Sequence, residues 1–264
     1  MDHLILKKPE IVPGRSGVVK TLQNCFGYYD ALEVRDALGF MPPLVAYAGT
    51  YLDEKSGTDK HYVGHRFYNC AMAEQWPHVL YYWAEFLMDT FFLPKSEVMT
   101  ALLGAPEGGK AFSFALVTLM NKCKERSVRY IFSEKDVIEA KSQSSREKSK
   151  MVMGRHIILR GDKLWIGEDV VNNLSTPGKM NPLIESLFAE LQGIFCVINR
   201  SPNEYFEIGG RKLPIAAVAN IPTLQFRQDD PAVAEEVEKG NVIWKPKDGW
   251  VDQIIIPYLI PMAA

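Results

Sequence analysis

Short apolar runs, separated by turns that contain glycine or proline, dominate the second half of the chain. Each run has the length of a strand, and we expect strands at 127–132, 155–159, 164–166 and 194–198. Apolar residues recur with helical spacing over 111–123 and again over 184–191, which predicts two helices. The segment Tyr205–Pro222 has the pattern of a hairpin that leads into a final strand.

The first half of the chain shows longer patterns. Residues 18–38 have mixed helical spacing, and 76–93 is predicted to be a helix. Strands are expected at 44–52 and 61–71, on either side of the polar turn 53–60. The helix over 76–93 is very apolar but carries three ionisable side chains, so we interpret it as a buried or interface helix rather than a membrane span.

Composition bounds the class of protein. The chain has 264 residues, of which 47% are apolar and 23% charged, as is typical of one large soluble domain or a core with a smaller lobe. A net charge of −2 gives no indication of nucleic-acid binding. The cysteines are too widely spaced for a zinc site and indicate buried thiols in a reducing compartment: Cys25, Cys70, Cys123 and Cys196. Residues 1–10 lack the apolar region of a signal peptide, so we expect a cytoplasmic protein.

The most informative stretch is 163–179, KLWIGEDVVNNLSTPGK. Its apolar residues 164–166 predict a buried strand that ends in the adjacent carboxylates Glu168 and Asp169. A polar run follows, and Pro177 suits the first position of a helix. Small polar side chains and free N–H groups before a helix form a phosphate cradle, here from Asn172, Asn173, Ser175 and Thr176.

Two carboxylates at the end of a strand can accept hydrogen bonds from a sugar diol or lie beside a magnesium-bound ligand. Parallel sheets bind ligands outside the carboxyl ends of their strands. Together with the phosphate cradle, the acidic pair therefore predicts a site for a ribose 5-phosphate. The alternative interpretation is a buried strand that ends in a solvated acidic turn.

This order resembles the motif with which type I phosphoribosyltransferases bind 5-phosphoribosyl 1-pyrophosphate (PRPP), and most of all its form in the orotate enzymes. The resemblance is good through Val171. The family usually has Thr-Thr-Gly or Thr-Ala-Gly where this chain has Asn172, Asn173 and Leu174. Glycine permits a positive φ and close phosphate approach, which Leu174 does not do freely, so the departure puts the phosphate loop in doubt.

Two more segments extend the resemblance. The sequence 104–110, GAPEGGK, is similar to the family's pyrophosphate-binding loop, which implies phosphate-binding roles for Glu107, Gly108, Gly109 and Lys110. Residues 133–150 are rich in serine and lysine and occupy the place of the loop that closes over PRPP, so we expect this segment to be mobile. Catalytic roles for Lys135 and Lys141 follow from that resemblance, although the family's His-Gly pair is absent. A solvated linker is the alternative.

Base recognition is implied by two further matches. Residues 66–69 resemble the aromatic segment that covers the base in the orotate enzymes, which implies base-binding roles for Phe67 and Tyr68, assisted by Lys60. Asn199 and Arg200 stand where that family has Asp-Arg, and its arginine binds the orotate carboxylate. The alternatives are aromatic residues that pack a small lobe and an arginine at the surface that pairs with Glu204 or Glu207.

The resemblance implies an α/β fold with a mostly parallel sheet, helices on both faces and a small N-terminal hood. We expect N-terminal helices and hood over 1–95, the core over 96–222, and a C-terminal tail without an assigned role over 223–264. The implied reaction is displacement of pyrophosphate from PRPP by a nitrogen of a nucleobase, with orotate as the first candidate, to give a nucleoside 5'-monophosphate. The resemblance also implies Mg²⁺ and a homodimer, and we expect the protein to bind neither nucleic acid nor membranes. A PRPP or nucleotide sensor without turnover, or a transferase for another base, stays open.

Overall fold

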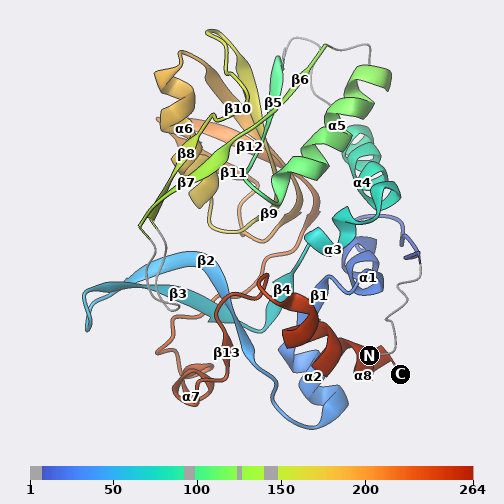
Figure 1. Ribbon diagram of the computed structural model, residues 1–264, viewed down its shortest axis with the longest axis vertical. Helices are drawn as coiled ribbons and strands as arrows, with labels where there is room; N and C mark the ends of the chain where they lie inside the picture. Colours follow the sequence, from blue (N-terminus) through green and yellow to red (C-terminus); the bar gives the residue numbers. More distant parts are fainter. Residues whose placement is uncertain (1–7, 92–98, 124–126, 140–147, 264) are drawn as a thin grey trace.

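A six-stranded sheet forms the centre of the molecule, in the order β11-β12-β10-β9-β5-β6 (Figure 1). The computed structural model describes residues 8–91, 99–123, 127–139 and 148–263. The strands of this sheet are β5 (Ala101–Gly104), β6 (Arg129–Phe132), β9 (Lys163–Val171), β10 (Glu190–Asn199), β11 (Tyr205–Ile208) and β12 (Arg211–Asn220). All neighbouring pairs are parallel except the β11/β12 hairpin at the edge. The predicted α/β class with a mostly parallel sheet is confirmed.

Helices cover both faces of this sheet because its strands are apolar on both sides. On one face, Leu102 and Trp165 pack in a core with α4 (Pro77–Thr90) and α5 (Gly109–Cys123). On the other face, Leu103 and Ile166 pack in a second core with α6 (Ser175–Ser186). Figure 1 shows α6 on the opposite side of the sheet from α4 and α5. The unbroken apolar runs of the sequence therefore correspond to strands that are buried on both faces of the sheet.

A smaller three-stranded sheet, in the order β13-β2-β3, lies beside the carboxyl ends of the central strands (Figure 1). It consists of β2 (Leu44–Asp53), β3 (Thr58–Gly64) and β13 (Val242–Ile243). We call this sheet the hood. Because β13 pairs in parallel with β2, the C-terminal segment contributes a strand to the hood. The remaining elements near it are α1 (Gly17–Asn24), β1 (Tyr28–Asp30), α2 (Ala31–Leu38), β4 (Arg66–Tyr68), α3 (Ala71–Glu74), α7 (Ala234–Glu238), η1 (Val251–Leu259) and α8 (Ile260–Ala263).

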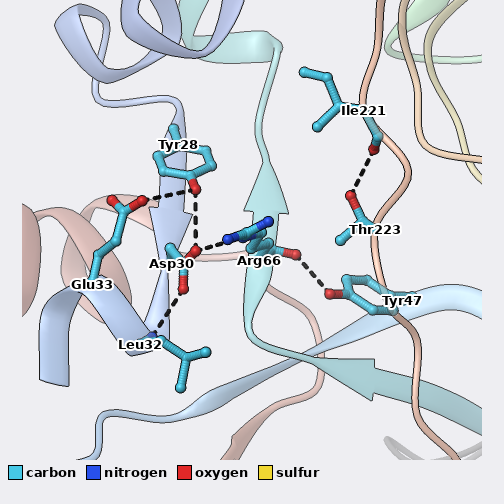
Figure 2. A network of polar contacts seen from close by, with 8 residues as sticks. All are labelled: Tyr28, Asp30, Leu32, Glu33, Tyr47, Arg66, Ile221 and Thr223. Atoms are coloured by element: carbon cyan, nitrogen blue, oxygen red, sulfur yellow. Dashed lines mark hydrogen bonds and ion pairs between the residues drawn. The ribbon is translucent and has the colours of Figure 1, made fainter. Parts of the chain in front are cut away.

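A polar network fixes β4 between the hood and α2 (Figure 2). Asp30, whose side chain is 1% exposed, accepts a hydrogen bond from Arg66 Nε at 2.5 Å and caps α2 by accepting from Leu32 N at 2.9 Å. The Arg66 carbonyl in turn accepts from the Tyr47 hydroxyl of β2 at 2.8 Å. The network therefore sets where the aromatic side chains of β2 and β4 lie.

Several predicted elements are wrong in detail. Residues 18–38 form not one helix but α1, β1 and α2, because Gly27 ends the first pattern and Asp30 caps a new helix. Residues 155–159 form no strand, and of the helix predicted over 184–191 only residues 184–186 are helical, because α6 ends at Ser186 and β10 begins at Glu190. Pro177 is the third residue of α6 rather than its first.

The segment predicted as a mobile loop over 133–150 is largely an antiparallel ribbon in its described parts. It is formed by β7 (Glu134–Glu139) and β8 (Lys148–Val152). Met151 is buried in the core that contains α6, and Asp136 pairs with Lys150 across the ribbon at 3.4 Å. Strand pairing and the burial of Met151 thus give regular structure to a segment whose composition suggested a loop, while its mobility stays a prediction. Lys141 lies outside the described residues.

Within the described part of the chain, none of the helices is long and apolar enough to cross a membrane. The cysteines Cys25, Cys70 and Cys196 are buried free thiols. The predicted helix at 76–93 corresponds to α4, which packs against α5 and β12 and so serves as a core helix.

Candidate functional site

A cavity of about 170 Å³ opens at the carboxyl ends of β9 and β10. The aromatic residues Tyr47, Phe67 and Tyr68 form one wall of it, and residues 172–177 form another. The charged residues that line this cavity are Glu107, Lys135, Glu168, Asp169, Arg200 and Lys247. We call this cavity the cleft.

The acidic pair lies where β9 extends beyond its neighbour. The pairing of β5 with β9 ends at Gly104 opposite Gly167, so Glu168 and Asp169 come after the end of β5. The two carboxylates are nonetheless buried, with 8% and 7% of their surface exposed. This geometry places the two carboxylates at the carboxyl-terminal edge of the sheet, next to the first turn of α6.

Burial and the neighbouring Asp169 raise the pKa of Glu168 to about 8, against the opposing effects of a hydrogen bond from Thr176 and the charges of Lys247 and Lys135. Burial, followed by the charge of Asp169, also raises the pKa of Glu74 in α3 to about 7. At neutral pH Glu168 therefore holds its proton. That proton is available to a bound sugar hydroxyl as a hydrogen-bond donor.

The raised pKa of Glu168 predicts how stability depends on pH. Between its ordinary value of 4.5 and about 8, the folded chain holds a proton that the unfolded chain has released. The free energy of unfolding should therefore fall as pH rises through this window. Thermal unfolding of wild type and Glu168→Gln across the window should show a midpoint that drops several degrees more in wild type. Parallel curves for the two proteins would contradict this origin of the pH dependence.

The loop before α5 packs directly on the acidic strand. A Cβ atom at Gly108 would overlap the carboxylate of Asp169, and one at Gly109 would overlap the carbonyl of Gly167. Glu107 adopts a positive φ of 67°, which is uncommon for a residue with a side chain. The two glycines thus allow the loop to approach β9 so closely that Gly108 and Asp169 share one side of the cleft.

Gly108→Ala should destabilise the fold by about 1–3 kcal/mol, because the new methyl group must displace Asp169 or the loop. It should also weaken binding of any ligand that uses Asp169. Gly178→Ala in α6 is the matched control, since a Cβ there meets no atom within 4 Å. Thermal unfolding of both variants checks this prediction, and wild-type stability in Gly108→Ala would show that the loop is loosely packed.

The turn between β9 and α6 is held by side chains rather than by glycine. Leu174 adopts φ 59°, so the positive φ that a family glycine would supply is present here at a cost of roughly 1–2 kcal/mol. Leu174 thus adopts this conformation at an energetic cost, as expected of a residue that does not take it freely. Asn172 Oδ1 accepts from Gln225 Nε2 at 2.6 Å, and Asn173 lies against Gly49 of the hood. The start of α6, with its positive dipole end, faces the cleft.

Arg200 is a buried cation with no anionic partner among the residues that the structure describes. Its side chain follows β10, only 4% of the residue is exposed, and its Nε and Nη2 atoms have no hydrogen-bond partner among the described residues. The guanidinium lies 4.1 Å from the ring centroid of Tyr47 and 5.5 Å from that of Tyr68. The alternative of a surface arginine is wrong, and the described residues show no ion pair of Arg200 with Glu204 or Glu207. A planar anion in the cleft would supply the missing partner.

Three of the predicted site residues lie away from the cleft. Lys60 pairs with Asp53 at 2.7 Å on the β2/β3 ribbon, and Lys110 lies 4.5 Å from the ring centroid of Phe132. Gly109 packs against β9 instead of lining the cavity. Lys135 does line the cleft, with its ammonium 3.5 Å from Glu107 Oε1. The other predicted residues that line the cleft are Glu107, Gly108, Glu168, Asp169, Asn172, Asn173, Ser175, Thr176, Arg200, Phe67 and Tyr68.

Two cleft residues escaped the sequence analysis. Tyr47, under the guanidinium of Arg200, is one of two tyrosines in its strand and carries no motif. Lys247 comes from the C-terminal segment, and its Nζ lies 3.3 Å from Asp169 Oδ2. A single lysine in a tail without a recognisable pattern gives no signal that would identify it. Among the described residues, no group of three or more His, Cys, Asp or Glu side chains is arranged to hold a metal ion.

No protein-family model matches this sequence, and neither does any curated protein. Solved structures with a similar arrangement include Leishmania donovani UMP synthase, at 14% identity and a TM-score of 0.44, over 77% of this chain and 35% of that one. The chain thus spans about a third of that protein. A second is Mycobacterium tuberculosis H37Rv orotate phosphoribosyltransferase, at 13% identity and a TM-score of 0.43, over 72% of this chain and 93% of that one.

A third is adenine phosphoribosyltransferase from Leishmania tarentolae, at 14% identity and a TM-score of 0.44, over 60% of this chain and 77% of that one.

Proposed function

We propose that this protein transfers the phosphoribosyl group of PRPP to a nucleobase, with orotate as the first candidate. The observation that carries this proposal is one cavity that faces a buried acidic pair, the start of a helix and a buried arginine. The Nε and Nη2 atoms of this arginine have no hydrogen-bond partner in the described part of the chain. A ribose diol, a phosphate and a planar carboxylate are the three groups that such a set of side chains would bind.

The ribose would lie on the acidic pair. Glu168 and Asp169 would hold its hydroxyl groups, and the charge of Asp169 would stabilise positive charge on the sugar ring as the bond to pyrophosphate breaks. The 5-phosphate would lie at the N-terminus of α6, beside Ser175 and Thr176. Pyrophosphate would leave with the bonding electron pair on the side of Gly108 and Lys135, where a cation balances its charge.

The base would occupy the side of the cleft that contains Arg200. A nitrogen atom of the base would attack the anomeric carbon while its ring lies among Tyr47, Phe67 and Tyr68. The guanidinium would bind a carboxylate with two parallel hydrogen bonds, since its Nε and Nη2 atoms are both free of other partners in the described structure. Orotate has such a carboxylate and purine bases do not.

The residues present fit a Mg²⁺ ion that arrives with PRPP better than one held by the protein alone. Magnesium is usually bound through one or two carboxylates together with substrate phosphates, and Asp169 lines the cleft as one such carboxylate. When bound, the ion would neutralise charge on the departing pyrophosphate. Asp169 is the residue that would hold it, because Glu168 holds a proton at neutral pH.

A second candidate is a protein that binds PRPP or a nucleotide without turnover. Lys247, which already pairs with Asp169, favours it, because a ligand must share that carboxylate. An assay of pyrophosphate release from PRPP separates the transferase from the sensor. It is run in the presence of Mg²⁺ with orotate, uracil, adenine and hypoxanthine in turn. We expect release with orotate. Release with another base alone would move the assignment to that base, and binding of PRPP without release would support the sensor.

A further inference from the structure

We propose that Lys247 is a substrate-binding residue of the cleft, delivered by the C-terminal segment to bind a phosphate group of the ligand. This inference rests on the proposed function in one respect, that the phosphate belongs to the pyrophosphate of PRPP. It gives residues 241–250 a role in the site, whereas the sequence suggested a tail of unassigned purpose.

The segment that carries Lys247 is fixed at both ends. Before it, β13 pairs with β2, with Val242 opposite Leu44 and Ile243 opposite Val45. After it, Trp250 is 4% exposed, and its Nε1 donates a hydrogen bond to the Phe26 carbonyl at 2.8 Å. The Trp250 ring also contacts Phe67, with 5.6 Å between the ring centroids. Lys247 is therefore presented to the cleft by an anchored loop rather than by a free chain end.

The ammonium group of Lys247 has N–H donors that its contact with Asp169 does not use. Lys247 Nζ lies 3.3 Å from Asp169 Oδ2, and an ammonium has three N–H donors, so two remain for another ligand. Its side chain is 46% exposed while that of Asp169 is 10% exposed, so the lysine reaches the buried carboxylate from the open side. Because Gly108 packs on the same carboxylate, the free donors lie next to the proposed pyrophosphate position.

The charge of the cleft gives the second reason. Its lining holds three acids, Glu107, Glu168 and Asp169, and three bases, Lys135, Arg200 and Lys247. Glu168 holds a proton at neutral pH, so without Lys247 the carboxylates of Glu107 and Asp169 would only be balanced by Lys135 and Arg200. The charge of Asp169 raises the pKa of Lys247 above its ordinary value, so the lysine stays charged at neutral pH. Lys247 thus gives the cleft an excess of positive charge, which favours an anionic ligand.

A competing explanation is that Lys247 only neutralises Asp169 and never touches the ligand. A double-mutant cycle separates the two, because Asp169→Asn removes the charge that would need neutralising. If Lys247 contacts the phosphate, Lys247→Met should weaken anion binding in the Asp169→Asn background as well. If it only neutralises Asp169, Lys247→Met should have no effect in that background.

The experiment is calorimetric titration of the full chain with PRPP and, separately, with inorganic pyrophosphate, both with Mg²⁺. We expect Lys247→Met to weaken binding of both by about tenfold or more, as loss of a charge-assisted hydrogen bond would. Lys247→Arg should retain most of the affinity, and Lys245→Met, an exposed lysine two positions away, should bind as wild type does. Thermal unfolding of each variant confirms that the comparison is between folded proteins.

Each outcome bears on one claim. Wild-type affinities in Lys247→Met, or no effect in the Asp169→Asn background, would overturn the role of Lys247 while leaving PRPP binding by the wild-type protein as support for the proposed function. Pyrophosphate binding that depends on Lys247, in a protein that does not bind PRPP, would uphold the lysine and overturn the proposed function. Binding of neither ligand by the wild-type protein would overturn both.

Discussion

Glu168→Gln combined with Asp169→Asn should reduce PRPP-dependent turnover by on the order of a thousandfold or more, because the pair is the only carboxylate pair at the proposed ribose position among the described residues that line the cleft. Asp169→Asn alone should account for most of the loss. Glu168 already holds a proton at neutral pH, given its pKa of about 8, so glutamine resembles its resting form. Steady-state rates of pyrophosphate release, measured for the two single variants and the double variant, show how much turnover each substitution removes.

The same variants should remain folded. Glu168→Gln removes a buried acid whose ionisation is unfavourable, and Asp169→Asn removes an ion pair whose lysine is 46% exposed, which contributes about 0–1 kcal/mol. Unfolding temperatures close to that of wild type would therefore accompany the loss of turnover. A double variant that binds PRPP with wild-type affinity would show that the ribose does not lie on these acids.

Arg200→Ala should have the second largest effect, a loss of about 2–5 kcal/mol in kcat/KM for orotate, with little change in PRPP affinity. Arg200→Lys keeps the charge but loses the planar fork, so its loss should be about 1–3 kcal/mol. The reason is that the Nε and Nη2 atoms have no partner in the described structure, so a carboxylate of the base would be their first hydrogen-bond acceptor. Orotate kinetics and PRPP titrations on both variants measure these effects side by side.

Stability provides the control for Arg200. An unpartnered buried cation contributes little to folding beyond its contact with Tyr47, and that contact is worth up to about 2 kcal/mol. Arg200→Met, which keeps an apolar stem over the ring, should therefore unfold near the wild-type temperature while it loses orotate use. Unchanged orotate kinetics in Arg200→Ala would end the assignment of this residue to the base and favour another base or a sensor.

The parts of the fold that the sequence predicts are those fixed by local pattern. The strand at 164–166 lies within β9, and the pattern over 111–123 lies within α5, because long apolar runs have few alternatives to burial. The acidic pair and the arginine after β10 lie in one cavity because neighbouring parallel strands end at the same edge. Short stretches of sequence are therefore enough to predict these strands, helices and site residues.

The parts that escaped prediction depend on contacts between distant segments. Lys247 meets Asp169 across 78 positions of sequence, and Arg66 meets Asp30 across 36. No local spacing encodes either pair. The turn at Leu174 also involves distant segments, since Asn172 bonds Gln225 and Asn173 lies against the hood beside a conformation that leucine does not favour alone.

The most direct measurement of the central claim is a crystal structure of the protein with PRPP and Mg²⁺. We expect the ribose hydroxyls on Glu168 and Asp169, and the 5-phosphate at the start of α6. The pyrophosphate should lie between Gly108 and Lys135, with Arg200 still free for a base. PRPP bound elsewhere, or a cleft that stays closed by the Lys247–Asp169 pair at saturating PRPP, would contradict the account.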